Sequence, residues 1–385
     1  MRLALTALSP PPVTMDRLTP QFSVRRASSV IPLMLAAIAS TAGANSAAYD
    51  QAPLDLDDLQ KLWLNDLPRS TADEALLNSY SEKRAKAFLD DTSLKWARQN
   101  RCGTCHTTIP YLMARPLLGG ANPAAWNEVR AAVSDFASDR IAKQAPDAAF
   151  IAGSSVAALA VGDAASGRPV QADTRALFDY LWASQGSEGA WVVPQKGMLP
   201  FLERDPRYIA FMVALGLGYT TGRYYEEDPR GRVGFAKLQG FIRNNLPSSV
   251  HDKAVLLWAS IRTHGLLSKK EQEDYTHSIL ALQRDDGGWA LPAMGSWLRH
   301  DGPASDPGVS DGYATALSAF VLCQRGYSAK DAPITRALVW IRRHQRVSGR
   351  WYTRSLYSEQ FQNYLSNMGT AYAVMALRSC DPQGS

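Results

Sequence analysis

One short motif occurs three times between residues 180 and 351 and constrains the fold of this chain more than any other feature. It consists of a glutamine, three residues, a glycine, one residue and a tryptophan. At this composition about 0.03 copies are expected by chance, so three copies mark an internal repeat. The copies are Gln185/Gly189/Trp191, Gln283/Gly287/Trp289 and Gln345/Gly349/Trp351.

The motif has a simple physical interpretation as the end of a helix. The glutamine amide can bond backbone groups left open where a helix stops, and the glycine permits a tight turn. The turn then brings the tryptophan back to pack on the helix that precedes it. We therefore interpret these glutamines and tryptophans as groups that stabilise the repeat and not as catalytic groups.

The periodicity of apolar residues predicts helices throughout the chain after residue 45. Apolar positions recur at intervals of three and four, and no alternating strand pattern competes with them. Proline and glycine separate the helical segments. The fold class predicted is therefore all-α. The predicted helices are 74–99, 122–144, 148–162, 174–184, 206–220, 231–245, 251–263, 269–282, 311–325, 332–344 and 362–379.

The repeated frame resembles the QW repeat of squalene and oxidosqualene cyclases and the related β-subunit repeat of protein prenyltransferases. For residues 147–385 this resemblance implies an α/α toroid, in which outer and inner helices alternate around a central apolar cavity. It implies that the helices ending in the motif are outer. It also implies that 206–220, 251–263, 311–325 and 368–379 are inner.

Asp311 is the only residue that resembles the acid of a cyclase. The segment Val309-Ser310-Asp311-Gly312-Tyr313-Ala314 resembles in part the Val-Ser-Asp-Cys-Thr-Ala of lanosterol-type cyclases, which implies Asp311 as a catalytic candidate. The Asp-x-Asp-Asp-Thr-Ala motif of hopene-forming cyclases and the zinc ligands of prenyltransferases are absent. An aspartate at the start of a helix is also a common N-cap, so both roles are open for Asp311.

The segment Cys102-Gly103-Thr104-Cys105-His106 is a C-x-x-C-H motif, which is the attachment sequence for c-type haem. Thiols at this spacing can form thioethers to the two haem vinyl groups, and the following histidine is then placed as the proximal iron ligand. The sequence thus predicts one haem c, bound covalently by Cys102 and Cys105 and ligated by His106. A local disulfide is the main alternative, since neither a βαβ context for a redox dithiol nor a second pair of zinc ligands is present.

The segment around this motif resembles a bacterial group of exported proteins in which a haem-binding segment precedes a squalene-cyclase-like domain. The resemblance places the haem in an N-terminal helical segment, 45–146. The distal iron ligand stays open among Met113, Met198 and Met294. A single methionine is more often core filler than ligand.

The N-terminus has the layout of a cleaved secretory signal. Arg25 and Arg26 precede a short apolar run, and Ala42-Gly43-Ala44 matches a cleavage site. We therefore expect a signal peptide at 1–44, no later membrane anchor and a periplasmic or secreted protein. The signal carries much of the formal charge of +5, so the remaining chain is nearly neutral and a nucleic-acid partner is not expected.

Taken together, these features predict a periplasmic haem protein that transfers electrons or oxidises a hydrophobic, terpenoid-like ligand held in the toroid. Small residues on the inner helices favour such a central pocket. The partners expected are this hydrophobic small molecule and a redox protein. The alternatives are a cyclase or isomerase that uses Asp311 and a non-enzymatic carrier of an apolar molecule.

Overall fold

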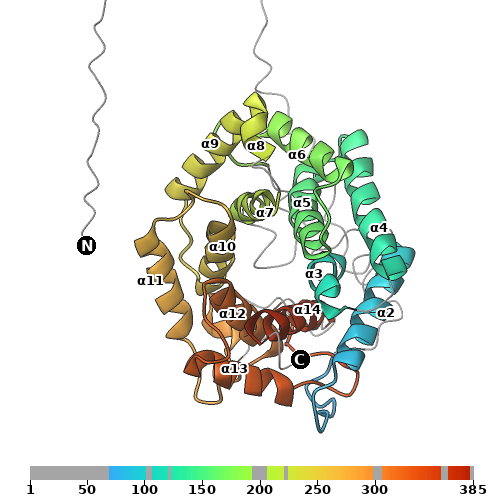
Figure 1. Ribbon diagram of the computed structural model, residues 1–385, viewed down its shortest axis with the longest axis vertical. Coiled ribbons are helices and arrows are strands. Elements are labelled where there is room, and N and C mark those ends of the chain that lie inside the picture. The colour runs from blue at the N-terminus through green and yellow to red at the C-terminus, as the bar shows by residue number, and fades with distance from the viewer. Residues whose placement is uncertain are drawn as a thin grey trace, which may run out of the picture. The chain divides into compact units, whose positions relative to one another are not determined.

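The protein is an α/α toroid, as the repeat and its resemblance predicted. The computed structural model describes residues 69–100, 106–119, 123–192, 206–220, 224–297, 306–356 and 363–381. Helices form two concentric rings in this part of the chain (Figure 1). No strand occurs among the described residues, and the only extended pairings there are two isolated bridges, Leu76 with Arg346 and Gln345 with Trp351.

Outer and inner helices alternate along the chain, so six hairpins build the ring (Figure 1). The outer helices are α2 (Glu82–Asn100), α4 (Pro123–Ala142), α6 (Ala172–Ser184), α9 (Pro229–Asn244), α11 (Lys269–Leu280) and α13 (Ala332–Arg343). The inner helices are α3 (Thr108–Ala114), α5 (Ala148–Ala165), α7 (Pro206–Gly218), α10 (Val250–Arg262), α12 (Gly312–Gln324) and α14 (Asn363–Cys380). Short elements accompany them: α8 (Tyr224–Glu227), η1 (Arg115–Leu118) and η3 (Leu291–Ala293).

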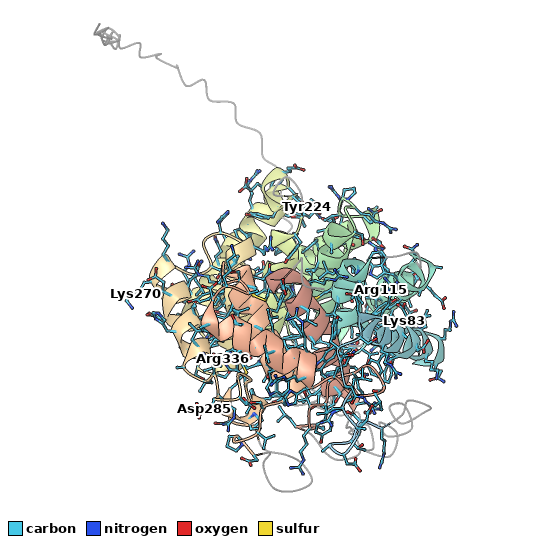
Figure 2. All side chains as sticks on the ribbon, turned by 60° about the horizontal axis from the view of Figure 1, so that its bottom comes forward. Lys83, Arg115, Tyr224, Lys270, Asp285 and Arg336 are labelled. Carbon is cyan, nitrogen blue, oxygen red and sulfur yellow. A yellow bond between two sulfur atoms is a disulfide. The ribbon has the colours of Figure 1, made fainter. Side chains whose placement is uncertain are left out.

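The two rings differ in burial as their sequences require. Eleven of the thirteen residues of α12 are buried, which explains why its sequence is apolar on every side. Outer helices are amphipathic and bury one face, with charged side chains such as Lys270 directed outward (Figure 2). By length and apolarity alone α5 could cross a membrane, but 83% of it is buried inside the protein, as expected of a core helix.

The three repeat tryptophans do what the sequence predicted. Each is buried, and each donates its indole N–H to a carbonyl of the outer helix ten residues earlier. The N–H to O distances are 2.8 Å from Trp191 to Leu181, 2.7 Å from Trp289 to Ile279 and 2.7 Å from Trp351 to Ile341. The indole thus fills space over the helix end and satisfies a carbonyl that the helix leaves open.

The repeat glutamines bond their own turn and also join neighbouring hairpins. Gln283 donates to Gly287 O at 3.0 Å and to Pro333 O, in the first turn of the next outer helix, at 2.7 Å. Gln345 donates to Gly349 O and to Ser81 O, both at 3.0 Å, just before α2. The last copy of the motif therefore closes the ring by joining α13 to α2.

Glycine is required at the turn because both its conformation and its neighbours exclude a side chain. Gly349 has a φ of 98°, and a Cβ there would lie 2.3 Å from Arg84 O. Gly287, with a φ of 89°, would place a Cβ 2.7 Å from Arg336 O. The turns thus bring adjacent outer helices into backbone contact.

The first hairpin, α2 and α3, is part of the ring. α3 contacts α5 and α14, and residues from Ala85 to Cys380 share one continuous hydrophobic core. The division expected at residue 147 therefore falls between two packed helices, α4 and α5. The expected signal peptide, 1–44, lies outside the described residues.

A disulfide that the sequence reasoning did not pair joins Cys323 near the end of α12 to Cys380 at the end of α14. The cross-link spans 57 residues of sequence, so it restricts the unfolded chain substantially. Replacing both cysteines by serine is expected to reduce the free energy of unfolding by about 2–4 kcal/mol, measured by urea denaturation. Stability equal to that of the native protein would show that the cross-link contributes nothing.

Candidate active site

The connectivity places all loops that lead from an outer helix to an inner helix at the same end of the ring. The three Gln-Trp turns belong to this class of loop. Each inner helix also begins at this end. Side chains from sequence-distant loops are therefore brought together over the inner-helix N-termini.

A pocket of about 210 Å³ opens at this end of the ring. It is smaller than the roughly 300–1,000 Å³ typical of sites for drug-sized ligands, so it admits one ring-sized group. Three loops build it: the segment before α2, the turn after Trp289 and the turn after Trp351. Its polar lining residues are Asp306, Ser310, Asp311, Tyr352, Thr353 and Arg354.

Asp311 is the N-cap of α12 and lines the pocket while remaining partly exposed. One carboxylate oxygen, Oδ1, accepts the Ala314 N–H at 3.0 Å and the Thr353 hydroxyl at 3.1 Å. The other oxygen, Oδ2, accepts the Leu291 N–H at 2.6 Å. These donors hold the carboxyl in one orientation at the wall of the pocket.

Burial dominates the ionisation of this carboxyl. Removal from water raises the pKa of Asp311 from 3.8 to about 6, because desolvation outweighs the hydrogen bonds from Ala314, Leu291 and Thr353 that favour the charged form. A carboxyl with a pKa near neutrality can both give and take a proton, which is the property required of a general acid.

Comparison of two repeats shows that an aspartate is not needed to hold this turn. In the second repeat the Trp289 N–H donates to Thr315 Oγ1 at 2.9 Å. The residue four positions before Thr315 is Asp311. In the third repeat Trp351 N donates to Thr370 Oγ1 at 3.2 Å, and four residues before it stands Ser366.

Ser366 binds the same backbone group that Asp311 binds. Its hydroxyl accepts the Thr353 N–H at 3.0 Å, two residues after Trp351, just as Asp311 accepts the Leu291 N–H two residues after Trp289. A hydroxyl therefore suffices for the structural role. Asp311 differs from Ser366 in that it also caps α12, through the Ala314 N–H, and places a titratable carboxyl at the pocket.

His106 lies two residues before α3 and its ring is buried, with 2% of the residue exposed. The ring packs edge-on against Tyr364 of α14 at a centroid distance of 4.7 Å. Next to it, Thr107 Oγ1 accepts the Asn367 amide at 3.1 Å. Cys102 and Cys105 lie outside the described residues, so the geometry of the predicted haem attachment is not part of the described structure.

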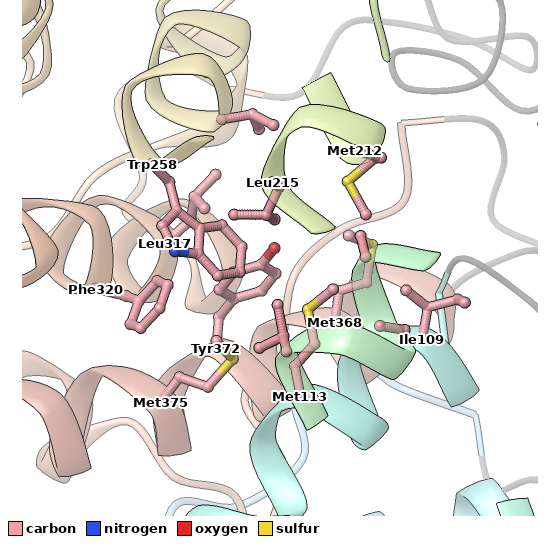
Figure 3. Close-up of a cluster of buried hydrophobic side chains, with 14 of the residues drawn as sticks. Ile109, Met113, Met212, Leu215, Trp258, Leu317, Phe320, Met368, Tyr372 and Met375 are labelled. Atoms are coloured by element: carbon pink, nitrogen blue, oxygen red, sulfur yellow. The ribbon is translucent and has the colours of Figure 1, made fainter. Parts of the chain in front are cut away.

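The methionines proposed as distal iron ligands lie in different places. Met113 of α3 is buried in the central apolar cluster with Met368 (Figure 3). Met294 is buried after η3, with its sulfur 4.0 Å from the Ser318 hydroxyl. Met198 lies outside the described residues. The described residues contain no group of three or more His, Cys, Asp or Glu that could hold a metal ion.

Side chains of the inner helices occupy the centre of the ring. Trp258, Phe320 and Tyr372 form mutual edge-on contacts there, with ring centroids 4.9–6.3 Å apart. Leu215 and Leu317 pack beside them (Figure 3). The described inner helices therefore form a packed core around these residues, and the small inner-helix residues do not leave open space at this cluster.

Comparisons with known proteins add the following. No protein-family profile and no curated protein sequence matches the chain. Among solved structures it is similar to an unsaturated glucuronyl hydrolase whose title names the oligosaccharide dGlcA-Glc-Rha-Glc, with 11% identity, a TM-score of 0.47, and coverage of 77% of this chain and 96% of that one. It is also similar to a structure titled as a wild-type glycosidase, with 11% identity, a TM-score of 0.40, and coverage of 81% and 91%.

The function predicted from the sequence is therefore corrected. Oxidation or carriage of an apolar ligand finds no open site among Trp258, Phe320 and Tyr372, whose rings pack against one another between the inner helices. The cyclase alternative is not supported, because Asp311 lines a small pocket built by loop residues at one end of the ring. The electron-transfer assignment and its haem and iron descriptors find no site among the described residues, which contain no group of three or more His, Cys, Asp or Glu that could hold a metal ion.

The sequence reasoning named Asp311 but missed the other walls of its pocket. Tyr352, Thr353 and Arg354 follow the third repeat tryptophan, where the second repeat has Ala290, Leu291 and Pro292. This replacement of apolar by polar residues is the sequence signal that could have indicated the second wall of the pocket. No sequence signal indicates that Ala72 lines the pocket, because only closure of the ring brings it there.

Proposed function

We propose that the protein hydrolyses a glycosidic bond, with Asp311 as the proton donor. The observation that supports this most strongly is a carboxyl with a pKa of about 6 at the wall of a pocket, in a position where the neighbouring repeat uses a serine. Glycoside hydrolysis requires such a carboxyl, because the leaving oxygen must be protonated by an acid that is still neutral near the working pH.

The reaction balances with the groups at the pocket and one water molecule. Asp311 gives its proton to the glycosidic oxygen as the bond from that oxygen to the anomeric carbon breaks. Asp306, the second carboxylate at the pocket, accepts a proton from the attacking water, whose oxygen bonds to the anomeric carbon. Loss of that proton to solvent and uptake of another by Asp311 restore the starting state.

The lining of the pocket suits a sugar ring, which has apolar faces and polar edges. Leu291, Pro292 and Val309 offer apolar contacts, while Ser310 and Arg354 offer hydrogen bonds. The volume of about 210 Å³ favours one sugar unit held in the pocket, with the rest of the substrate outside. Both similar solved structures are named as glycosidases, and the pocket is what supports the same class for this chain.

The test is hydrolysis of p-nitrophenyl glycosides of neutral and acidic hexoses, measured from pH 4 to 9. Because Asp311 must carry a proton, kcat/KM is expected to be highest below its pKa of about 6. It should fall tenfold for each further pH unit above that value. Absence of turnover on every glycoside, or a rate that increases above pH 6, would overturn the proposal.

We propose haem c separately, as a cofactor held by Cys102 and Cys105 with His106 on the iron. This rests on the C-x-x-C-H motif and on the position of His106 directly before an inner helix. Protein expressed with haem-maturation machinery is expected to gain the mass of one haem that survives denaturation, measured by mass spectrometry. A variant with Cys102→Ser and Cys105→Ser is the control, and an unmodified native mass would contradict the prediction.

Export to the periplasm or beyond remains a prediction from the N-terminal signal. The Cys323–Cys380 disulfide supports it, since such bonds persist mainly in oxidising compartments.

A further inference from the structure

Thr353 is the point at which the third repeat contacts the carboxyl of the second. It occupies the position after Trp351 that Leu291 occupies after Trp289, so a hydroxyl stands where the preceding repeat has an aliphatic side chain. Its Oγ1 donates to Asp311 Oδ1 at 3.1 Å and accepts the Tyr313 N–H at 2.8 Å. A leucine at this position could make neither bond.

The hydroxyl of Thr353 is held rigidly. Its residue is buried, with 1% exposed, and its backbone N–H donates to Ser366 Oγ at 3.0 Å. The Ser366 hydroxyl in turn lies 2.7 Å from the Ser70 hydroxyl, in the segment that closes the ring. Contacts with α14, and through Ser366 with the segment before α2, therefore hold Thr353 in place. Its hydroxyl in turn holds the carboxyl of Asp311.

From this geometry we infer that Thr353 is the positioning residue of Asp311, because its hydroxyl orients the carboxyl in the pocket and stabilises its ionised form. The role of Thr353 in catalysis rests on the proposed function. Its effect on the orientation and ionisation of Asp311 does not. The other hydrogen-bond donors to Asp311 are backbone N–H groups, so Thr353 is the side-chain donor among the described contacts. It is thus the donor that substitution can remove.

The charged and titratable groups near this pair are few. Asp306, Tyr352 and Arg354 line the same pocket, and Tyr313 on α12 interacts electrostatically with Asp311. Replacing Thr353 by valine, which has the same shape without the hydroxyl, leaves the side chains of these groups unchanged. Besides the hydrogen bond to Asp311, it removes only the acceptor of the Tyr313 backbone N–H. A change in the titration of Asp311 would then report the loss of the hydroxyl.

The experiment measures the titration of Asp311 directly, by NMR of protein labelled with ¹³C at aspartate carboxyls. The Asp311 signal is assigned by its absence in Asp311→Ser. In Thr353→Val the pKa of Asp311 is expected to increase by about one unit, because a donor to the charged form is lost. Thr353→Ser retains the hydroxyl and should titrate as the native protein does.

Thr276→Val is the matched control. It removes another mostly buried threonine hydroxyl, one that donates to Gln272 O within α11, so the pKa of Asp311 should not change. On an active substrate, Thr353→Val should also shift the alkaline limb of the pH–rate profile upward by the same amount and lower kcat more than it changes KM.

The outcomes separate this inference from the proposed function. If Asp311 titrates in Thr353→Val as in the native protein, Thr353 is not its positioning residue, whatever the activity. If the pKa shifts but no glycoside is hydrolysed, the positioning role is supported and the proposed reaction fails. If Thr353→Ser shifts the pKa as much as Thr353→Val, the shift does not come from the hydroxyl and the inference is overturned.

Discussion

Replacing Trp289 by alanine is expected to reduce the free energy of unfolding by about 3–5 kcal/mol, the usual cost of truncating a large buried aromatic side chain. Trp289 is fully buried, and its indole N–H satisfies the Ile279 carbonyl at the end of α11. Truncation would leave a cavity between an outer and an inner helix and remove one of the donors to the Ile279 carbonyl, which keeps the Leu282 N–H at 3.2 Å. Urea denaturation followed by circular dichroism measures the change.

Trp289→Phe separates the two causes. It retains most of the buried ring but removes the N–H donor, so the expected cost is only about 1–2 kcal/mol. Equal stability of Trp289→Ala and the native protein would contradict the assignment of this residue as a structural group. The same would hold if Trp289→Ala abolished activity while leaving stability unchanged.

The ring was predictable from sequence because its determinants are local and repeated. Each Gln-x3-Gly-x-Trp motif specifies the end of an outer helix, and the predicted helix 206–220 agrees with α7 within two residues. The inner helix α3 was missed. It has only seven residues, all of them buried and one of them Pro110, so it offers no amphipathic period to detect.

The central cavity could not be judged from sequence, because packing depends on side chains from several helices. Small residues such as Ala314 and Ala316 suggested open space, yet Trp258, Phe320 and Tyr372 pack against one another between the inner helices. Local patterns indicate which helix faces are buried. They do not indicate whether facing side chains from α10, α12 and α14 meet.

The site was only half predictable for a similar reason. Asp311 stood out as an acid within a repeat, but its pocket depends on ring closure between residues nearly 280 positions apart, such as Glu74 and Arg350. This buried ion pair, at 2.8 Å, holds the segment containing Ala72 against the last repeat. No periodicity in the sequence connects these two regions.

Replacing Asp311 by serine is expected to reduce kcat/KM on an active glycoside by about 10²–10⁴-fold, the usual contribution of a general acid. Serine is the appropriate substitution because Ser366 already holds the equivalent backbone N–H in the next repeat. The variant should therefore keep the turn after Trp289 while losing the proton donor. Steady-state kinetics between pH 4 and 9 measure the rate. They also show whether the decrease in kcat/KM above pH 6, which depends on Asp311, is lost.

The stability of this variant follows from the sign of the pKa change. The folded-state pKa of Asp311 is raised from 3.8 to about 6, so the protonated carboxyl favours folding below pH 3.8, and this contribution is lost as the pH rises through 6. The difference corresponds to about 3 kcal/mol. Serine has no such charge to bury, so Asp311→Ser should be no less stable than the native protein at pH 7 and should lack this pH dependence.

Asp228→Ser is the matched control, since Asp228 is also an N-cap, accepting the Arg230 N–H at 2.9 Å at the start of the outer helix α9. It makes the same chemical change away from the pocket and should leave kcat/KM unchanged. Equal losses of activity in the two variants would show that the effect of Asp311→Ser comes from helix capping. Full activity of a folded Asp311→Ser would exclude Asp311 as the proton donor.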